Sequence, residues 1–330
     1  MKSNVLIHSL YGKPGDVVHT TTYELPKLGP KQVQIDMAYS PINPADINML
    51  EGKYLVQPEL PCVLGNEGVG IIAEIGEEVE GISKGDHVIL PFRNQDNWIG
   101  LWAETVLSPA SEVIVIPKEI PLQQAAMLTI NPVTALQLLT LFTDLDEGDT
   151  LIQNAANSGV GRWVIALAKE RGINTINLVR NMELEDELKA LGATHVLEDH
   201  HGISVKAKKL ADTISLGLNA VGGQSATEVL KSLSEQSTCV TYGAMSKEPI
   251  QVSNGQLIYK NIWLTGFNRS KWVQEMPKEV VIEAYKEVLN TITNSPFEVP
   301  VDKVYAMAEA EKAIIHASVG DRNGKILFEL

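Results

Sequence analysis

Hydrophobic and polar residues alternate in the first part of the chain, as they do in strands with one buried face. Residues 31–39 alternate in this way, and shorter apolar runs follow at residues 68–74 and 87–91. Glycine, proline and charged residues separate these runs, for example at residues 81–86. Many short strands punctuated by turns predict a β-rich domain with the shape of a partly open barrel.

The pattern changes near Pro121, where apolar strands begin to alternate with segments of helical periodicity. The expected strands are residues 150–154, 175–179, 195–197, 214–219, 238–242 and 262–265. The expected helices are residues 132–140, 160–171, 185–191, 225–233 and 255–259. Strands that alternate with helices are typical of a parallel sheet with crossover helices, so this region predicts a doubly wound, dinucleotide-binding sheet.

The pattern of hydrophobic and polar residues changes again in the last part of the chain. A helix is expected at residues 278–290, an amphipathic helix at 307–317 and a final strand at 324–329. Because this segment is too short to form a domain of its own, we expect it to pack onto the N-terminal part. The prediction is an α/β protein with two domains. Residues 1–124 together with 269–330 form the β-rich domain, and residues 125–268 form the dinucleotide-binding domain.

Charge and composition exclude several classes of partner. The chain has 330 residues and a formal net charge of −14, which repels nucleic acid. No apolar run approaches the ~20 residues that span a bilayer, so no membrane partner is expected. The two cysteines stand in apolar surroundings, and no apolar leader is evident, so we expect a cytoplasmic protein. A phosphorylated ligand requires a local basic patch, and its candidates are Lys53, Arg93, Arg269 and Lys271.

The strongest local motif is a strand, a turn of small residues and a helix within residues 151–172. Ala156, Ser158 and Gly161 hold the positions of the G-x-G-x-x-G fingerprint, with Gly159 added, so the match to the strict pattern is poor. The order of strand, turn and helix nevertheless suits a pyrophosphate. Such a group binds the backbone N–H groups of a helix N-terminus, and the small side chains of the turn leave room for it. The alternative is a structural turn without a ligand.

Arg180 follows the next expected strand. Enzymes that use NAD carry an acidic residue at this point to hold the ribose hydroxyls. A guanidinium group binds phosphate through two hydrogen bonds and stays charged, so Arg180 predicts NADPH as the cofactor. The alternative is a surface arginine without a ligand.

The chain resembles the mitochondrial-type trans-2-enoyl thioester reductases of the medium-chain dehydrogenase/reductase family. The resemblance covers essentially the whole chain and includes the runs INPADINMLEGKY, GNEGVG, NSGVG, TINLVR, NAVGGQSATEVL and VTYGAMSK. It implies a GroES-like β-rich domain beside a Rossmann-type sheet. The NADP contacts that it implies are Asn131, Asn157, Ser158, Gly159, Val160, Arg180, Tyr242, Gly243, Met245, Phe267 and Lys325. The chain departs from the family pattern at Asn181-Met182 and at Asn268.

Zinc-dependent members of this superfamily carry a cysteine and a histidine at positions that here hold Asn43 and Asn66. Neither asparagine is a usual zinc ligand. We therefore expect no metal. Without a Lewis acid, alcohol oxidation through a metal alkoxide loses its chemistry, which leaves hydride transfer to a carbon made electrophilic by conjugation.

Reduction of a conjugated thioester also requires a proton donor. A tyrosine is protonated at neutral pH, and the resemblance assigns this catalytic role to Tyr54. It further places Asn43, Trp102 and Trp272 in the substrate pocket, and Trp98 flanks the same loop as Trp102. The alternative for the tyrosine is a packing or cofactor-contacting role, and the alternative for each tryptophan is ordinary packing.

Three functions fit these observations. The first is NADPH-dependent reduction of the C2=C3 bond of 2-enoyl thioesters, carried on coenzyme A or on acyl carrier protein. The second is an NADPH:quinone or enone reductase on the same fold, and the third is a non-enzymatic NADPH binder. We also expect a homodimer, because residues 262–265 form an apolar edge strand that would otherwise stay exposed.

Overall fold

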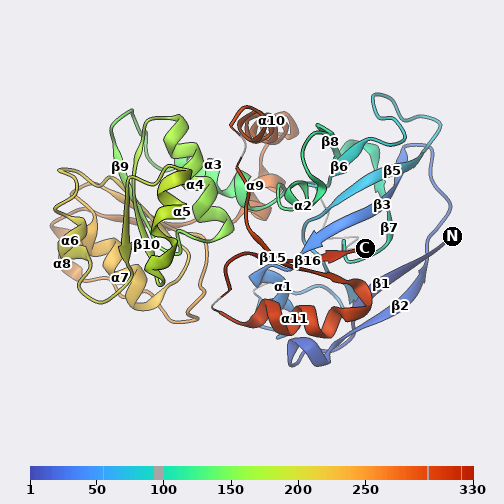
Figure 1. Cartoon of the computed structure of the whole chain (residues 1–330), viewed down its shortest axis with the longest axis horizontal. Helices are drawn as coiled ribbons and strands as arrows, with labels where there is room; N and C mark the ends of the chain where they lie inside the picture. Colours follow the sequence, from blue (N-terminus) through green and yellow to red (C-terminus); the bar gives the residue numbers. More distant parts are fainter. Residues whose placement is uncertain (55, 93–99, 296, 321) are drawn as a thin grey trace. The chain divides into compact units, whose positions relative to one another are not determined.

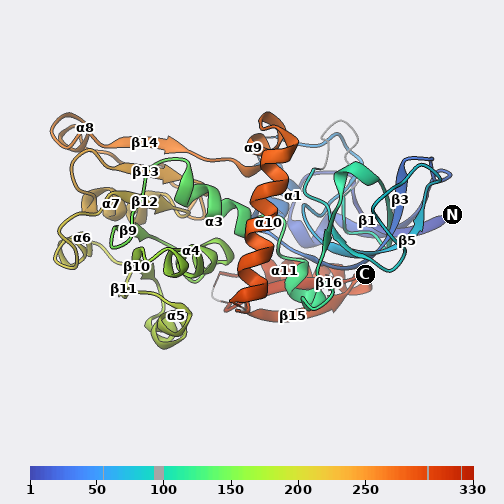
Figure 2. The same ribbon diagram turned by 90° about the horizontal axis from the view of Figure 1, so that it is seen from above.

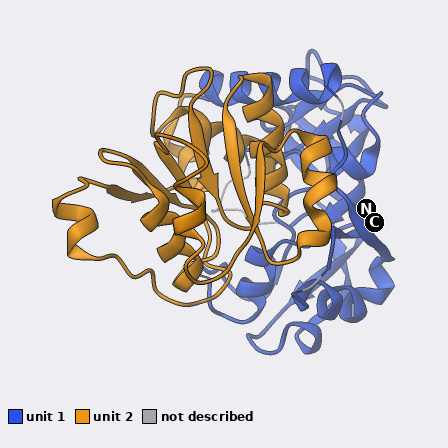
Figure 3. Cartoon of the chain, turned by 60° about the vertical axis from the view of Figure 1, so that its left-hand side comes forward, with its two compact units in different colours: residues 1–130, 278–330 blue, residues 131–277 orange. Residues whose placement is uncertain are grey.

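The computed structural model describes residues 1–54, 56–92, 100–295, 297–320 and 322–330. Contacts divide them into two compact units, which Figure 3 shows in different colours. Unit 1 comprises Met1–Ile130 and Lys278–Leu330, and unit 2 comprises Asn131–Pro277. The divisions fall somewhat later than residues 124 and 268, where the sequence pattern placed them. The second division is later because helix α9 (Arg269–Glu275) groups with the sheet whose last strand it follows.

Unit 2 contains a six-stranded sheet in which all neighbouring strands are parallel. Its strands are β9 (Thr150–Gln153), β10 (Asn174–Val179), β11 (His195–Glu198), β12 (Leu216–Asn219), β13 (Thr238–Thr241) and β14 (Trp263–Gly266). Their order is β11-β10-β9-β12-β13-β14, as Figure 2 shows. The chain moves outward from β9 and then returns to its other side, so the switch point lies between β9 and β12. All six strands expected from the sequence are confirmed.

Helices cover both faces of this sheet. They are α3 (Asn131–Thr140), α4 (Gly159–Glu170), α5 (Glu185–Leu191), α6 (Ser204–Ala207), α7 (Gly223–Ser232) and α8 (Asn254–Ile258). One apolar cluster joins the sheet to α6 and α7 through residues such as Ile176 and Val229. A second cluster joins it to α4 and α5 through Ile165 and Leu188. Because both faces are covered, the inner strands β9, β10 and β12 are buried along almost their whole length, and the polar residues they carry, such as Gln153 and Asn177, are buried too.

Unit 1 is built around a mixed seven-stranded sheet and a three-stranded sheet. The first has the order β15-β16-β3-β5-β6-β8 with β7 paired to β3, and the second has the order β2-β1-β4. The strands are β1 (Lys2–His8), β2 (Val18–Glu24), β3 (Gln32–Pro41), β4 (Cys62–Val63), β5 (Val69–Ile75), β6 (His87–Ile89), β7 (Thr105–Pro109), β8 (Ile114–Ile116), β15 (Val301–Ala306) and β16 (Lys325–Glu329). The last strand pairs antiparallel with β3, so the C-terminal residues extend a sheet formed by the N-terminal ones.

The helices of unit 1 are α1 (Pro44–Leu50), α2 (Leu122–Ala125), α10 (Lys278–Asn294) and α11 (Ala310–Ser318). Short 3-10 turns lie at Pro14–Asp16, Ala110–Glu112 and Met307–Glu309, and in unit 2 at Met182–Leu184. Helix α11 lies beside α1 in Figure 1, and both pack on a core that contains Trp102 and Phe328. The sequence analysis missed α1, which begins at a proline and is capped by Asp46. No helix among the described residues is long and apolar enough to cross a membrane.

Candidate active site

The small-residue turn of unit 2 joins the end of β9 to α4 at the switch point of the sheet. Ser158 is the N-cap of α4, and its Oγ accepts a hydrogen bond from the Gly161 backbone N–H at 3.1 Å. The remaining N–H groups of the first turn have no helical partner and carry the positive end of the helix dipole. This end of α4 therefore suits an anionic group such as a pyrophosphate.

Two glycines in this turn make close contacts, with backbone at Gly161 and with a side chain at Gly159. A Cβ atom on Gly161 would lie 2.5 Å from the Ala156 carbonyl oxygen, and one on Gly159 would lie 2.7 Å from Asn131 Nδ2. A third special position is Ala155, whose φ of 48° is in the left-handed region usually taken by glycine. Among the positions assigned from the fingerprint, Gly161 therefore allows the close backbone approach that the motif requires. Ala156 is buried, and its backbone N–H donates to Leu178 O.

Asn131 lies beside this turn, next to Gly159. Its side chain is 7% exposed, and its Nδ2 atom has no hydrogen-bond partner among the described residues. A buried donor without a partner costs free energy, so it indicates an acceptor that arrives with a ligand. Asn157 and Val160 belong to the same turn, which the Arg162 side chain ties down by donating to Asn157 O at 3.0 Å.

The residues expected on the nicotinamide side follow β13 and β14. The Tyr242 hydroxyl is buried close to Ser158, and burial raises the pKa of this phenol. A Cβ atom on Gly243 would lie 2.7 Å from Ala220 O, so the backbones of the two neighbouring strand ends approach closely there. Phe267 packs edge-on against Phe142 with ring centroids 6.0 Å apart, whereas Met245 is exposed.

Arg180 is exposed directly after β10, at the edge of the same turn region. The positive charge of Arg180 acts to lower the pKa of Asp199, which follows β11. Burial raises the pKa of Asp199, and the Ser225 hydroxyl, which donates to its Oδ2 at 2.6 Å, partly offsets that effect. The sequence analysis did not identify Asp199, although its place after a strand of the sheet was a usable signal.

Side-chain amides connect the carboxyl ends of the inner strands. Asn154 Nδ2 donates to Asn219 Oδ1 at 2.8 Å and to Ser225 Oγ at 2.9 Å, and Asn154 Oδ1 accepts from the Ala220 N–H at 2.8 Å. Asn219 Nδ2 donates in turn to Thr241 Oγ1 at 3.2 Å. This network holds the ends of β9, β12 and β13 in register, and it was missed because its members come from separate strands.

Unit 1 contains a second polar centre, buried around α1 and β16. Asn43 Nδ2 donates to Glu67 Oε1 at 2.8 Å, and Lys325 Nζ donates to Asn43 Oδ1. Asp46 accepts from the Asn43 N–H at 2.7 Å and from Asn66 Nδ2 at 2.5 Å. Glu67 Oε2 also accepts from the Ile130 N–H at 3.0 Å. The structure thus brings together the two asparagines that replace the zinc ligands and surrounds them with two carboxylates and an ammonium group.

This centre does not fit a zinc ion. The Nδ2 atoms of Asn43 and Asn66 donate to carboxylates, so they present hydrogens rather than lone pairs. The ammonium group of Lys325 stands where it would repel a cation. Among the described residues, no group of three or more His, Cys, Asp or Glu side chains is arranged to hold a metal.

Tyr54 lies just after α1, and its N–H donates to Asn48 O at 3.2 Å. Its ring is half-buried against the core cluster that contains Leu50 and Cys62, and its carbonyl accepts from Gln57 Nε2 at 2.9 Å. The backbone is therefore held on both sides of this tyrosine.

The structure describes two of the three tryptophans that were considered for the substrate pocket. Trp102 is fully buried and packs edge-on against Phe328 at 5.2 Å between ring centroids, which supports the packing alternative. Trp272 is buried on α9. Trp98 and Arg93 lie outside the described residues.

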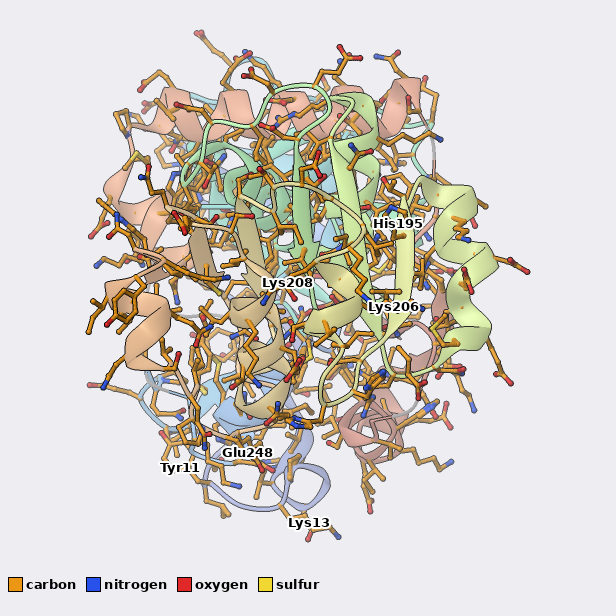
Figure 4. The ribbon with its side chains drawn as sticks, turned by 90° about the vertical axis from the view of Figure 1, so that its left-hand side faces the viewer. Tyr11, Lys13, His195, Lys206, Lys208 and Glu248 are labelled. Carbon is orange, nitrogen blue, oxygen red and sulfur yellow. The ribbon has the colours of Figure 1, made fainter. Side chains whose placement is uncertain are left out.

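Two of the remaining basic candidates lie beside carboxylates of their own segments. Lys53 pairs with Glu51 at 3.1 Å, and Lys271 lies 3.7 Å from Glu275. Arg269 adjoins Lys271 at the start of α9. A different group of cations is exposed on unit 2, where Figure 4 labels Lys206 of α6 and Lys208 beside it.

Comparisons with known proteins assign the family. A model described as "Alcohol dehydrogenase GroES-like domain" matches residues 29–118, and one described as "Zinc-binding dehydrogenase" matches residues 159–287. The mitochondrial enoyl-[acyl-carrier-protein] reductase of Bos taurus is 40% identical over 294 residues, which cover 87% of this chain and 77% of the relative. That of Xenopus tropicalis is 36% identical over 319 residues, which cover 94% and 90%.

Two solved structures show the same fold. An enoyl thioester reductase from Candida tropicalis, in a mutant form, has a TM-score of 0.89 at 24% identity and matches over the full length of both chains. A putative NADPH:quinone reductase from Bacillus thuringiensis has a TM-score of 0.91 at 25% identity, with 100% of this chain and 99% of the other covered.

These comparisons also correct the expected location. The curated relatives are mitochondrial enzymes, which contradicts the cytoplasmic location expected from the sequence. Buried thiols indicate a reducing surrounding but do not say which compartment provides it. The expected fold of a GroES-like domain and a Rossmann-type sheet is confirmed. By its identity to relatives over most of their length, the chain belongs to the medium-chain dehydrogenase/reductase family, among the enoyl-[acyl-carrier-protein] reductases.

Proposed function

We propose that this protein reduces the C2=C3 double bond of trans-2-enoyl thioesters with NADPH. The observation that carries the proposal is the small-residue turn at the switch point, with the unpartnered Asn131 amide inside it and Arg180 at the end of the next strand. The relatives at 36–40% identity support the thioester as substrate. The neighbour described as the Etr1p/NADP/crotonyl-CoA complex binds both kinds of ligand on this fold.

NADPH, when bound, supplies a hydride to the β-carbon of the substrate. The α-carbon then requires a proton, and Tyr54 is the proposed donor because a phenol is protonated at neutral pH. The proposed cofactor contacts are Asn131, Asn157, Ser158, Gly159, Val160, Arg180, Tyr242, Gly243, Met245, Phe267 and Lys325. Arg180 would select the 2′-phosphate through bidentate hydrogen bonds. The amides of Asn43 and Asn66 donate to carboxylates and are not usual zinc ligands, which supports a reaction on a substrate that conjugation has already activated.

The test is NADPH consumption with crotonyl-CoA, with the same acyl group on acyl carrier protein, and with a small quinone. We expect rapid oxidation with a thioester and little with the quinone. The quinone reductase remains the second candidate, because the putative NADPH:quinone reductase has the same fold at 25% identity. Fast turnover of the quinone alone would favour that candidate and refute thioester reduction.

Replacement of Tyr54 by phenylalanine tests the proton donor. Loss of general acid catalysis lowers kcat by at least about tenfold, while the dissociation constant for NADPH stays the same. Tyr11→Phe is the matched control, because its hydroxyl contacts Pro58 O at 3.5 Å in the same region of unit 1. If both variants retain wild-type turnover with an enoyl thioester, Tyr54 is not the donor.

We further propose a homodimer joined through β14. This strand is the last in the sheet, and Trp263 is 68% exposed on it beside the exposed Ile258 and Tyr259 at the end of α8. An apolar edge of this kind pairs readily with a second strand. Light scattering after size exclusion should show twice the chain mass for the wild type and one chain mass for Trp263→Glu.

A further inference from the structure

The carboxyl ends of β10 and β11 in unit 2 carry opposite charges at neighbouring positions. The two strands are parallel, and their register pairs Val179 with Glu198. The next residue on each strand is charged, Arg180 on one and Asp199 on the other. The Asp199 N–H donates to Val179 O at 2.7 Å, which continues the ladder by one bond. Because neighbouring strands lie about 4.8 Å apart, the cation and the carboxylate start from adjacent backbone positions.

The side chain of Asp199 is held in place by α7. Ser225 Oγ donates to Asp199 Oδ2 at 2.6 Å and accepts from Asn154 Nδ2 at 2.9 Å. The orientation of this amide is fixed, because Asn154 Oδ1 accepts from the Ala220 N–H at 2.8 Å. A hydroxyl group has one hydrogen to donate, and that of Ser225 is directed at the carboxylate. The carboxylate therefore keeps its place at this edge of the sheet without help from a ligand.

The second carboxylate oxygen of Asp199 is available to a ligand. Its Oδ1 atom has no hydrogen-bond partner in the part of the chain that the structure describes, and the side chain is only partly buried. Such an oxygen can accept a ribose hydroxyl, as acidic residues do in enzymes that use NAD, but it repels a phosphate. In residues 180–187, Arg180 is the one basic residue and four residues are acidic. A 2′-phosphate at Arg180 would therefore be attracted by that cation and opposed by its acidic surroundings.

We propose that Asp199 is a specificity-determining residue that limits the preference of this protein for NADPH over NADH. Its carboxylate repels the 2′-phosphate that Arg180 attracts, whereas NADH carries a neutral hydroxyl at the same position. This inference rests on the proposed function, in which the cofactor binds at the turn after β9 and Arg180 holds the 2′-phosphate. It deepens that function by naming a residue that opposes the arginine.

The experiment measures the dissociation constants for NADPH and NADH, by their fluorescence, in the wild type and in Asp199→Asn at pH 8. Asparagine keeps an acceptor for Ser225 Oγ and removes the charge. In about 20 mM salt, we expect NADPH to bind about fivefold more tightly to the variant and NADH to change less than about twofold. Salt at about 0.5 M should remove most of this gain, because it screens charges that water reaches. A purely structural role would not distinguish the two cofactors in this way.

Glu198→Gln is the matched control. It removes the same charge one residue earlier on β11, and successive side chains of a strand point to opposite faces of the sheet. The control should leave the ratio of the two dissociation constants unchanged. If Asp199→Asn leaves this ratio unchanged or weakens NADPH, the carboxylate does not oppose the phosphate and the inference is wrong. It is equally wrong if Glu198→Gln strengthens NADPH binding as much as Asp199→Asn does.

Arg180→Met separates this inference from the proposed function. We expect the variant to bind NADPH at least about tenfold more weakly, with little change for NADH, because the phosphate loses a charged donor. Unchanged NADPH binding would refute the cofactor site in the proposed function. If Arg180→Met has the expected effect and Asp199→Asn has none, only the role of Asp199 fails. A protein that shows both effects but reduces no enoyl thioester would refute the proposed reaction and leave this inference standing.

Discussion

The two units of this protein build their polar sites in different ways. Unit 2 uses its backbone, because a helix N-terminus, two crowded glycines and the left-handed Ala155 shape the turn after β9. Unit 1 uses buried side chains, because two carboxylates, two amides and one ammonium group form its polar centre. A backbone site depends on local residue size, whereas a side-chain site depends on which distant residues meet.

Two buried carboxylates show the same difference in their electrostatics. Burial raises the pKa of Asp46 to about 6, despite hydrogen bonds from Asn43 and Asn66. Burial also acts to raise the pKa of Glu228, but hydrogen bonds from Ser204 and Lys231 outweigh it and lower the pKa to about 2. Unit 1 therefore retains a carboxyl group, Asp46, that is costly to ionise, whereas unit 2 stabilises the ionised form of Glu228.

The largest effect is expected from Gly161→Ala, which changes the backbone of the turn after β9 directly. The new Cβ atom would lie 2.5 Å from the Ala156 carbonyl oxygen, so the turn must move. We expect NADPH binding to weaken more than about 100-fold and the free energy of unfolding to fall by about 2–3 kcal/mol. Titration with NADPH and urea unfolding measure these effects. Gly255→Ala is the control, since its Cβ atom would meet nothing closer than 3.9 Å.

Asp46→Asn tests the unit 1 centre through the pH dependence of stability. A folded-state pKa raised from 3.8 to about 6 favours folding at low pH, and this contribution is lost as pH rises through about 6. Relative to the wild type, the variant should therefore gain up to about 3 kcal/mol between pH 4 and pH 7. Urea unfolding at several pH values measures this gain. Parallel stability curves for the two proteins would contradict the raised pKa.

Glu228→Gln makes the opposite test in unit 2. A lowered pKa stabilises the fold above the ordinary value of 4.5, and this contribution is lost as pH falls through about 2. The variant should be less stable by about 1–2 kcal/mol at pH 7, because it loses a charged acceptor of several hydrogen bonds. The difference in the free energy of unfolding between the variant and the wild type, measured by urea unfolding, should be smaller at pH 3. A difference that is constant from pH 7 to pH 3 would argue against the stabilised charge.

The smallest effect is expected from Ala155→Gly. Glycine relieves the left-handed backbone at φ 48° but makes the unfolded chain more flexible, and the two changes nearly cancel. The free energy of unfolding should change by less than about 0.5 kcal/mol, with NADPH affinity unchanged. A large loss of affinity would mean that the methyl group of Ala155 itself shapes the site.

Much of the fold could be predicted from the sequence. The strands and helices of unit 2 repeat strong apolar patterns, so residues 150–154 and 160–171 were placed nearly correctly as β9 and α4. Strands β1 and β2 were missed. Strand β2 is partly or fully exposed along its length, so it has no apolar face to detect. Helix α1 was missed because its seven residues are too few to show a periodicity.

The site divides in the same way. The turn after β9 and the position of Arg180 are local features, so residue types in order along the chain were enough to predict them. The Asn154–Asn219 pair was not found, because it joins strands that are adjacent only in the folded sheet. Asp199 was not found either, although its place directly after β11 was a usable signal. Trp102 looked like a pocket residue, and only packing shows it in the core.

The sequence alone determined the fold class, the position of the small-residue turn after β9 and the asparagines at positions 43 and 66. These follow from local periodicity, residue size and the chemistry of single side chains. Only the tertiary structure decided that Lys325 meets Asn43, because β16 must pair with β3 before residues 282 positions apart can share a hydrogen bond. Burial and partnership set the charge of such groups, and neither is a property of the residue by itself.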